Sequence, residues 1–468
     1  MWDTYFLNQE DASDSDSTAE DMWDIYFLNQ EDVINDAEIA PDNNKSAEVF
    51  SKLIPPNASD PKSADSLIAS QMAKLSVADR EKAYMDVHGI PDLVAETPEL
   101  IQKSLLELQH EIDMLPDKKA YSFAARVDAK YVQDRDFCLA CLRCEKFDCQ
   151  KAAIRIIRHF QMKLDLFGVD KLVMRITQDD LETDDMDALY SSTGRFLNVY
   201  DTGGRIINLI VQVRKMFKTD AILRRGFYNL VTAYHDVEIQ RRGFVSVVLH
   251  SLDEIKNTSA DNAELVWKMP KLNEGSPMYM SALHLCYSEE TWEGLHALVK
   301  TSLSQKNQAR CRVHHGTVLE CLERLRGNGI DPSSIPVNDR GEITDHFEDS
   351  QRLEKQRCLE RLKYPIRSTI GVPFCEDVLL GKGTPFQIHT GNRKLRKIVV
   401  DRHKEYEKAK KGRKKVIAQE CVDAIRSNGG LFLKQDGNKW FVVDIEVAIK
   451  KVGALFRSLR LRKADGPK

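Results

Sequence analysis

Four cysteines, Cys138, Cys141, Cys144 and Cys149, lie close together in the sequence. Thiolates at such spacings bind zinc or iron–sulfur clusters. However, the segment from Asp136 to Cys144 contains no Gly or Pro and reads as a helix. Positions three and six residues apart drift around a helix, so four sulfurs would not surround one ion. The sequence therefore predicts small, buried hydrophobic cysteines and no metal site.

The histidines and carboxylates of the sequence indicate a metal or catalytic site no more clearly than the four cysteines do. His314-His315 ends a predicted strand, but no carboxylate or second histidine lies at ligand spacing, so we expect a packing or capping role. His284 is expected in the core. The pairs Asp179-Asp180 and Asp184-Asp185 are expected to form an exposed acidic turn. Since no Ser/His/Asp or Cys/His set is evident, the sequence predicts a protein that is not an enzyme and uses no cofactor.

Positive charge gives the clearest sign of a partner. From Gly381 to Lys463 the chain carries 22 Lys or Arg against 8 Asp or Glu, whereas its first 60 residues hold 15 acids and 2 lysines. Such opposed ends favour a polyanion-binding module and an acidic tail. Clustered cations neutralise phosphates or act as a nuclear import signal. The predicted polyanion-binding residues are Arg393, Lys394, Lys410, Lys411, Arg413, Lys414, Lys415 and Lys439.

The composition is that of a soluble protein with two or three domains. The chain has 468 residues, 42% hydrophobic and 30% charged, which is enough for several cores. No apolar run reaches the about 18 residues of a membrane helix. The acidic start lacks the features of a secretory signal. The ten cysteines are therefore expected to be reduced thiols in the cytoplasm or the nucleus.

The chain divides into five predicted segments. Residues 1–65 are a disordered acidic tail in which Met1–Asp11 recurs as Met22–Asp32, either as a doubled motif for a protein partner or as a duplication without a role. The others are a helical lobe at 66–200, a β/α lobe at 201–340, a linker with a charged helix at 341–375 and a basic domain at 376–463.

Apolar runs of strand length alternate with helical stretches in the β/α lobe. The runs are Ile206–Val213, Phe244–Leu249, Met278–Leu285 and Ala309–His314. This order predicts an α/β fold with a mixed, mostly parallel sheet, and a further helix is expected at 289–303.

The basic domain is predicted to be a helix, a helix, a β-hairpin and a helix. Asn392 is expected to cap the first helix, and Gly429-Gly430 to end the second. Gln435-Asp-Gly-Asn438 is a hairpin signal because Asp-Gly tolerates positive φ. Gly381-Lys-Gly383 is similar to part of a kinase glycine loop, but Phe386 replaces the third glycine and no catalytic motif follows, so a kinase is excluded.

Residues 75–340 resemble a divergent, diatom-type CRAL-TRIO protein of the lipid-transfer superfamily. The resemblance is carried by Leu142-Arg-Cys-Glu-Lys-Phe-Asp148, Leu164-Asp-Leu-Phe-Gly168, Asp201-Thr-Gly-Gly-Arg205 and Arg312-Val-His-His-Gly316. It implies a helical lobe and a β/α lobe with an apolar pocket for a lipid, a phosphoinositide included. The strand residues expected to line that pocket are Ile207, Leu209, Val211, Val245, Val247, Met280 and Ala282. His250-Ser-Leu-Asp253 departs from the family's usual pattern after the second strand.

Residues 376–462 resemble an uncharacterised domain that recurs in diatom proteins. The residues that carry this resemblance include Asp377, Gly381, Gly383, Gly391 and Asn392. The resemblance implies no activity.

These observations predict a non-enzymatic, intracellular protein that binds a lipid or another hydrophobic ligand. Its basic domain would engage an anionic membrane surface or a nucleic acid. The alternative is a nucleic-acid-binding nuclear regulator in which the CRAL-TRIO-like lobe is a degenerate scaffold.

Overall fold

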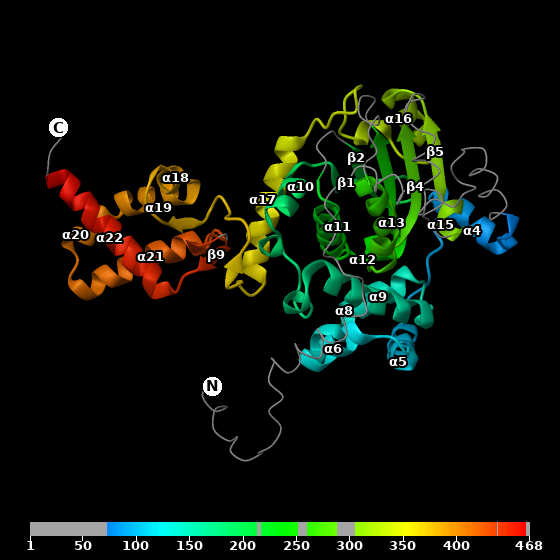
Figure 1. Ribbon diagram of the computed structural model, residues 1–468, viewed down its shortest axis with the longest axis horizontal. Coiled ribbons are helices and arrows are strands. Elements are labelled where there is room, and N and C mark those ends of the chain that lie inside the picture. Colours follow the sequence, from blue (N-terminus) through cyan, green and yellow to red (C-terminus); the bar gives the residue numbers. More distant parts are fainter. Residues whose placement is uncertain (1–72, 213–216, 251–259, 288–304, 438, 465–468) are drawn as a thin grey trace, which may run out of the picture. The chain divides into compact units, whose positions relative to one another are not determined.

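A five-stranded sheet forms the centre of the larger part of the protein (Figure 1). The structure, a computed structural model, describes residues 73–212, 217–250, 260–287, 305–437 and 439–464. The strands are β1 (Gly194–Tyr200), β2 (Ile206–Gln212), β3 (Phe244–His250), β4 (Met280–Tyr287) and β5 (Cys311–His315), and they lie in this order in the sheet. β1 is antiparallel to β2, and β2 to β5 are parallel. The predicted α/β class and mostly parallel sheet are confirmed.

β1 is a strand that the sequence analysis does not predict, and it lies in the segment expected to be helical. Arg195 and Asn198 interrupt its apolar pattern. The chain then turns into β2 at Asp201, whose carboxylate accepts hydrogen bonds from the Arg205 backbone N–H (2.8 Å) and from Arg205 Nε (2.7 Å). Both residues are buried, so the Asp-x-x-Gly-Arg motif closes a β-hairpin.

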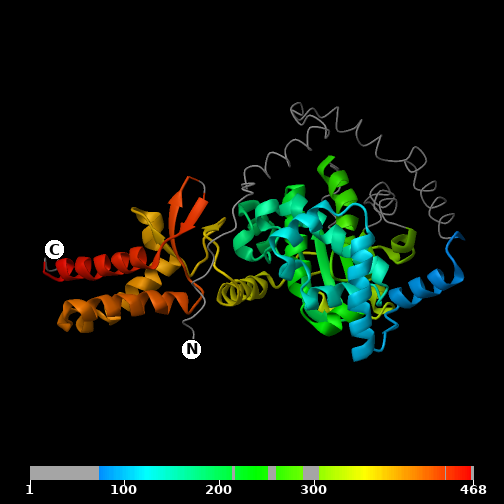
Figure 2. The same cartoon turned by 90° about the horizontal axis from the view of Figure 1, so that it is seen from below.

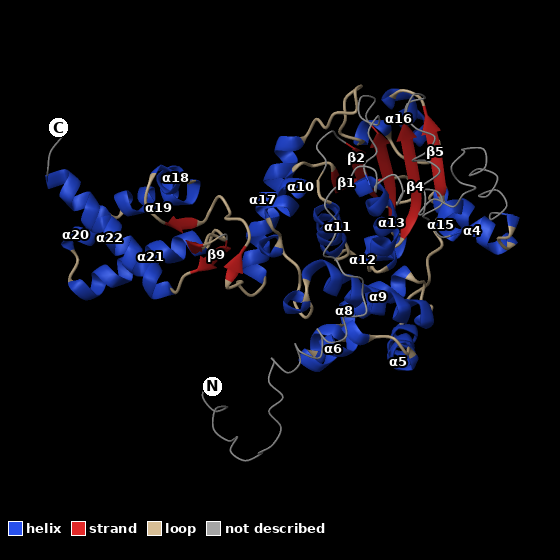
Figure 3. Cartoon of the chain, viewed as in Figure 1, coloured by secondary structure: helices blue, strands red, loops and turns tan. Residues whose placement is uncertain are grey.

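Helices cover both faces of the sheet (Figure 3). They are α11 (Thr219–Ala233), α12 (Val237–Arg242), α13 (Ala260–Glu274) and α16 (Val318–Arg326). The short helix α15 (Gln305–Ala309) lies directly before β5. Because side chains alternate along a strand, Ile206 and Phe244 pack against α11 and α13 on one face. Ile207 and Val245 pack against α16 on the other.

A lobe of helices precedes the sheet. Its α-helices are α4 (Val77–Val87), α5 (Pro98–Met114), α6 (Lys119–Val127), α7 (Ala129–Val132), α8 (Arg135–Cys144), α9 (Cys149–Phe167) and α10 (Thr183–Tyr190). Short 3₁₀ helices lie at Val169–Lys171, Gln178–Asp180 and, beyond the sheet, Pro332–Ser334. Thr97, Asp134 and Asp148 each accept a hydrogen bond from a backbone N–H three residues later, which caps α5, α8 and α9.

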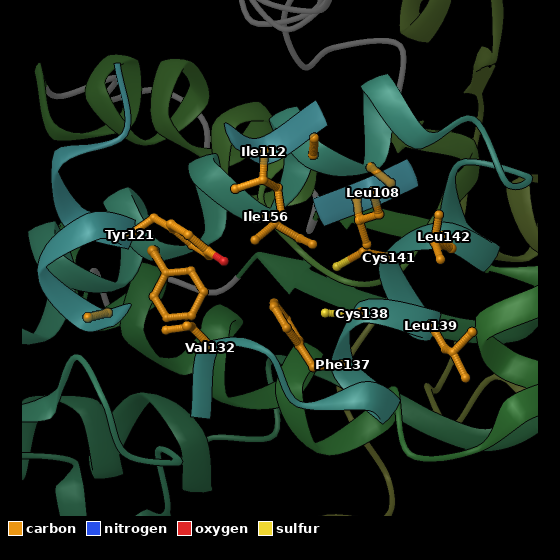
Figure 4. Close-up of a cluster of buried hydrophobic side chains, with 14 of the residues drawn as sticks. Leu108, Ile112, Tyr121, Val132, Phe137, Cys138, Leu139, Cys141, Leu142 and Ile156 are labelled. Atoms are coloured by element: carbon orange, nitrogen blue, oxygen red, sulfur yellow. The ribbon is translucent and has the colours of Figure 1, made fainter. Parts of the chain in front are cut away.

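The four cysteines lie in the core of this lobe, as the helical reading predicts. Cys138, Cys141 and Cys144 lie on α8, and Cys149 begins α9; all four are buried. Figure 4 shows Cys138 and Cys141 among hydrophobic side chains such as Leu108 and Ile156. Burial raises the pKa of the Cys138 thiol to about 12. In the described ranges, no group of three or more His, Cys, Asp or Glu side chains could hold a metal ion.

A separate small α/β region follows α17 (His346–Lys363). It comprises β6 (Thr369–Ile370), β7 (Val378–Leu380), α18 (Thr384–Ile388), α19 (Thr390–Asp401), α20 (His403–Lys408), α21 (Lys411–Arg426), β8 (Phe432–Asp436), β9 (Lys439–Val442) and α22 (Ile445–Ala464). Its sheet has the order β6-β9-β8-β7. The predicted helix, helix, hairpin and helix are all present, with β6, β7 and two short helices in addition.

Two buried side chains, Asp377 and Asn392, hold segments of this region together through hydrogen bonds to the backbone. Asp377 is fully buried, and its carboxylate accepts hydrogen bonds from the backbone N–H groups of Phe374 (2.7 Å) and Leu431 (2.8 Å). The prediction that Asn392 caps a helix is wrong, because α19 already begins at Thr390. Instead, the Asn392 amide bonds to both the N–H and the C=O of Leu379. These two bonds satisfy the backbone N–H and C=O of Leu379 in β7, as a neighbouring strand would.

The acidic pairs at 179–185 are not an exposed turn, so that prediction is wrong for most of their members. Asp179, Asp180 and Asp185 are buried, and only Asp184 is partly exposed. The Asp179 carboxylate accepts hydrogen bonds from Arg357 Nε (2.8 Å) and Arg361 Nε (2.7 Å), both on α17. Burial opposes ionisation of Asp179, but the two guanidinium groups outweigh it and hold its pKa below the usual value.

Arg361 connects α17 to the small α/β region. Its guanidinium bonds to Asp179 and also to Asp377, with 2.5 Å between Arg361 Nη1 and Asp377 Oδ1. The predicted linker is therefore a helix with buried ionic contacts on both sides.

Some predictions concern residues outside the described ranges. These are the acidic tail at 1–65, its doubled motif and the helix expected at 289–303. Among the helices that the structure describes, none is long and apolar enough to cross a membrane.

Candidate functional site: an aromatic cavity and a basic surface

The strand residues predicted to line a pocket lie mostly in a packed core. Ile207, Leu209, Val211, Val245, Val247 and Ala282 belong to one buried cluster, which α16 covers. None of them lines either of the two cavities described below. Met280 lies on the opposite face of the sheet and is partly buried. Of the seven predicted residues, it is the one that lines either of these two cavities in the described part of the chain.

The larger cavity, of about 670 Å³, opens between the helical lobe and the helices of the β/α lobe. Its wall comes from α7, α8, α9, α11, α12, residues 173–176, the last residue of α17 and the chain directly after it. Six aromatic side chains line it: Tyr131, Phe137, Phe160, Phe227, Tyr234 and Tyr364. Several meet edge to face; for example, the ring centroids of Phe137 and Phe160 are 6.1 Å apart. We call this space the aromatic cavity.

Lys163 lies on the buried face of α9 at the wall of the aromatic cavity. Only 1% of the residue is exposed. Its ammonium donates a hydrogen bond to Tyr131 Oη (2.6 Å) and another to the Met174 carbonyl. Burial is the largest cause that lowers its pKa well below the ordinary value; Asp180 raises the pKa, and Arg367 and Arg175 lower it. Periodicity could have found this lysine, because it falls on the apolar stripe that contains Ile156 and Phe160.

Arg175 and two histidines stand near Lys163. Arg175 donates to the Val231 carbonyl (2.8 Å), contacts His235 Nε2 and lies 5.1 Å from the centroid of the Tyr364 ring. His159 is buried, with Nδ1 3.0 Å from the Gly275 carbonyl oxygen. Its Nδ1 must carry the proton, because a carbonyl can only accept. Burial lowers the pKa of His159 to about 3 and that of His235 to about 4, so both rings are neutral near pH 7.

A second cleft, of about 530 Å³, is more polar. It lies between α4, the start of α9, the end of α13 and the region before β5. Lys82 and Arg310 both approach the Asp86 carboxylate, at 3.7 and 2.8 Å. Burial lowers the pKa of Lys82 to about 8. Because acids accompany most of the cations here, this cleft carries little excess charge.

The sequence analysis missed a pair of buried histidines. His284 Nδ1 on β4 and His314 Nε2 on β5 lie 3.0 Å apart, and their rings stack. Burial lowers the pKa of His284 to about 3 and that of His314 to about 4. The two residues are 30 positions apart in the chain, so only the parallel pairing of β4 with β5 brings them together. Buried and neutral, they fit a packing role.

The predicted polyanion-binding residues fall into separate groups. Lys410, Lys411, Arg413, Lys414 and Lys415 lie at the start of α21. Lys439 lies on the β-hairpin at the opposite end of this helix (Figure 2). Sixteen helical residues span about 24 Å. Arg393 and Lys394 lie in the first turn of α19. The eight cations therefore come from three elements of the region, α19, the start of α21 and the hairpin strand β9.

Local acids already contact part of the cluster on α21. Arg413 bonds to Glu405 and Glu420, at 2.9 Å each, and Lys415 bonds to Glu446 at 2.9 Å. These pairs are exposed, and exposed pairs contribute little to stability, so phosphates could replace the acids. Lys410 and Lys411 are exposed as well. The start of α21 is thus the most cationic point of the predicted surface.

Comparison with known proteins assigns one part of the chain. Residues 377–458 match a family model described as a domain of unknown function (DUF6824). This match covers β7 to most of α22 and carries no activity. No CRAL-TRIO family model matches the chain, and no curated protein matches it. The CRAL-TRIO resemblance of residues 75–340 therefore remains a prediction.

Proposed function

We propose that the protein is a non-enzymatic binding protein that holds a lipid or another hydrophobic ligand in the aromatic cavity. One observation carries the proposal: six aromatic side chains from separate elements surround about 670 Å³ of space. Pockets for small ligands have volumes of about 300–1,000 Å³ and mostly apolar walls. The resemblance to lipid-transfer proteins favours a lipid. The ligand would then lie between helices, away from the strand residues predicted at first.

The proposal is tested with the full-length protein by native mass spectrometry. We expect a mass increment from a co-purified hydrophobic molecule, or uptake of lipid after incubation with vesicles. Val173 lines the cavity, so Val173→Trp should fill part of the space and abolish uptake. Leu106→Trp is the matched control, because Leu106 is 71% exposed on α5. A protein that is empty as purified and takes up nothing would refute the proposal.

A second function is supported by the cations at the start of α21. We propose that this part binds a polyanion, as the sequence predicts. Five cations at a helix N-terminus repel the positive end of the helix dipole, and a bound phosphate would relieve that repulsion. We expect the partner to be duplex DNA. Binding to anionic vesicles is measured alongside it as the alternative. Replacing Lys410, Lys411 and Lys414 by Gln should lower the salt dependence of binding, whereas Lys439→Gln should change it little.

A further inference from the structure

We propose that the ligand of the aromatic cavity carries one acidic group, a carboxylate or a phosphate monoester, which binds at Lys163 and Arg175. This inference rests on the function proposed above and specifies the class of ligand.

The charges around the aromatic cavity are unbalanced. Six cations line it, Lys130, Arg143, Lys163, Arg175, Lys363 and Arg367, against the two acids Asp134 and Asp136. Acids outside the cavity pair with two of the cations: Glu96 with Arg143 and Asp180 with Arg367. The other four form no ion pair with any residue that the structure describes. An anion inside the cavity would restore the balance.

Lys163 is the strongest indication of an anion. A buried ammonium group is costly unless a charge compensates it. Here its hydrogen-bond acceptors are a phenol and a carbonyl, both of them neutral. Asp180 favours the charged form, whereas Arg367 and Arg175 oppose it, and burial exceeds them all. Tyr131 and the neutral His159 add no charge nearby. An acidic ligand would supply the missing counter-charge.

Arg175 supplies the geometry for binding an acid. It follows Met174, whose carbonyl accepts the hydrogen bond from Lys163, so the two cations reach the same wall. Its guanidinium meets a carbonyl, a neutral histidine and the Tyr364 ring, but no carboxylate among the described residues. A planar guanidinium binds the two oxygens of a carboxylate or a phosphate side by side.

The aromatic part of the cavity wall indicates the chemical character of the ligand beyond its acidic group. Aromatic faces and edges surround the two cations, so the acid should extend an apolar or aromatic group into the cavity. Two cations on one wall suit a single acidic group better than a polyphosphate. We therefore expect a small amphiphilic acid, such as a fatty or aromatic acid.

The test compares probes that share a naphthyl ring and carry either an acidic or a neutral polar group. Calorimetric titration of the full-length protein would use 2-naphthoate, 2-naphthyl phosphate and the neutral 2-naphthylmethanol. We expect an acidic probe to bind at least about tenfold more tightly than the alcohol, since charged hydrogen bonds contribute about 1.5–3 kcal/mol. The two acidic probes distinguish a carboxylate site from a phosphate site.

Two variants locate the binding. Arg175→Gln and Lys163→Met should each reduce the preference for the acid about tenfold while leaving the affinity for the alcohol nearly unchanged. Arg175 is partly exposed, so its variant should fold even if Lys163→Met does not. Arg158→Gln, in the second cleft, is the control and should change nothing.

The outcomes separate the two proposals. Equal binding of acid and alcohol would overturn the inference while leaving a hydrophobic site in place. A preference for acid that survives Arg175→Gln would also overturn it. If no probe binds and the lipid experiment finds an empty protein, both proposals fail.

Discussion

Buried titratable side chains have the clearest consequences at the scale of single residues. Lys163, His159, His284 and Asp179 lie inside the protein, where water does not solvate their charges. Asp179 is ionised between two arginines, whereas burial favours the neutral form of His159 and His284. The neutral groups make stability depend on pH.

His159 should make the protein less stable in acid. Its pKa is about 3 in the folded state and about 6.5 in an unfolded chain. As pH falls below 6.5, the unfolded chain takes up a proton that folded His159 does not, so stability is lost. For this residue the loss between pH 7.5 and pH 5 is about 2 kcal/mol. In urea unfolding at both pH values, His159→Phe should reduce the total loss by about that amount.

Exposed His110 on α5 provides the control for this measurement. His110→Phe removes an imidazole that is in contact with water in the folded protein, so it is the matched exposed variant. If the two variants lose the same stability between the two pH values, His159 does not resist protonation in the folded protein.

At the scale of elements, close backbone contacts fix the small α/β region. A Cβ atom at Gly391 would lie 2.1 Å from the Asp377 carbonyl oxygen, so the start of α19 can approach β7 only because this residue is glycine. A Cβ atom at Gly412, in the first turn of α21, would meet nothing within 4 Å. Both glycines lie in helices, but only one is required by packing.

Replacing each glycine by alanine should therefore have opposite effects. Gly391→Ala should destabilise the protein by more than about 2 kcal/mol, because backbone must move. Gly412→Ala should stabilise it by about 0.5–1 kcal/mol, because alanine loses less conformational entropy in a helix. Thermal unfolding checks both changes. An equal loss of stability in the two variants would contradict the packing argument.

At the scale of the whole molecule, the part that matches the known family is smaller than the structural unit. The match begins at Asp377, but β6 lies before it and pairs with β9. Ile370 of β6 is buried beside Leu379 and Leu433. The sheet of this region is therefore completed by residues outside the matched segment.

Two fragments test this boundary. A fragment of residues 364–464 should unfold cooperatively when circular dichroism is followed with temperature. A fragment of residues 377–458 should lose that cooperativity, because it lacks β6 and exposes the cluster that Ile370 covers. Identical melting of the two fragments would show that β6 is dispensable.

The local pattern of apolar, polar and turn-forming residues was enough to predict most of the helices and strands. The four parallel strands follow from their apolar runs, and the hairpin at 432–442 follows from Asp-Gly. The buried cysteines follow from a helix without Gly or Pro. β1 could not be predicted, because its polar residues hide the pattern and its pairing with β2 defines it. Asn392 was misassigned because its amide bonds to a strand that precedes it by 13 residues.

The sequence by itself determined the class of fold, the charge of the C-terminal region and the burial of the cysteines. These properties depend on composition and on periods of two or 3.6 residues, which neighbouring residues set. Only the tertiary structure decided that Asp179 meets Arg361, that His284 meets His314, and that Lys163 and Arg175 share a cavity wall. The physical reason is that burial and charge pairing depend on residues distant in the chain, which packing alone brings together.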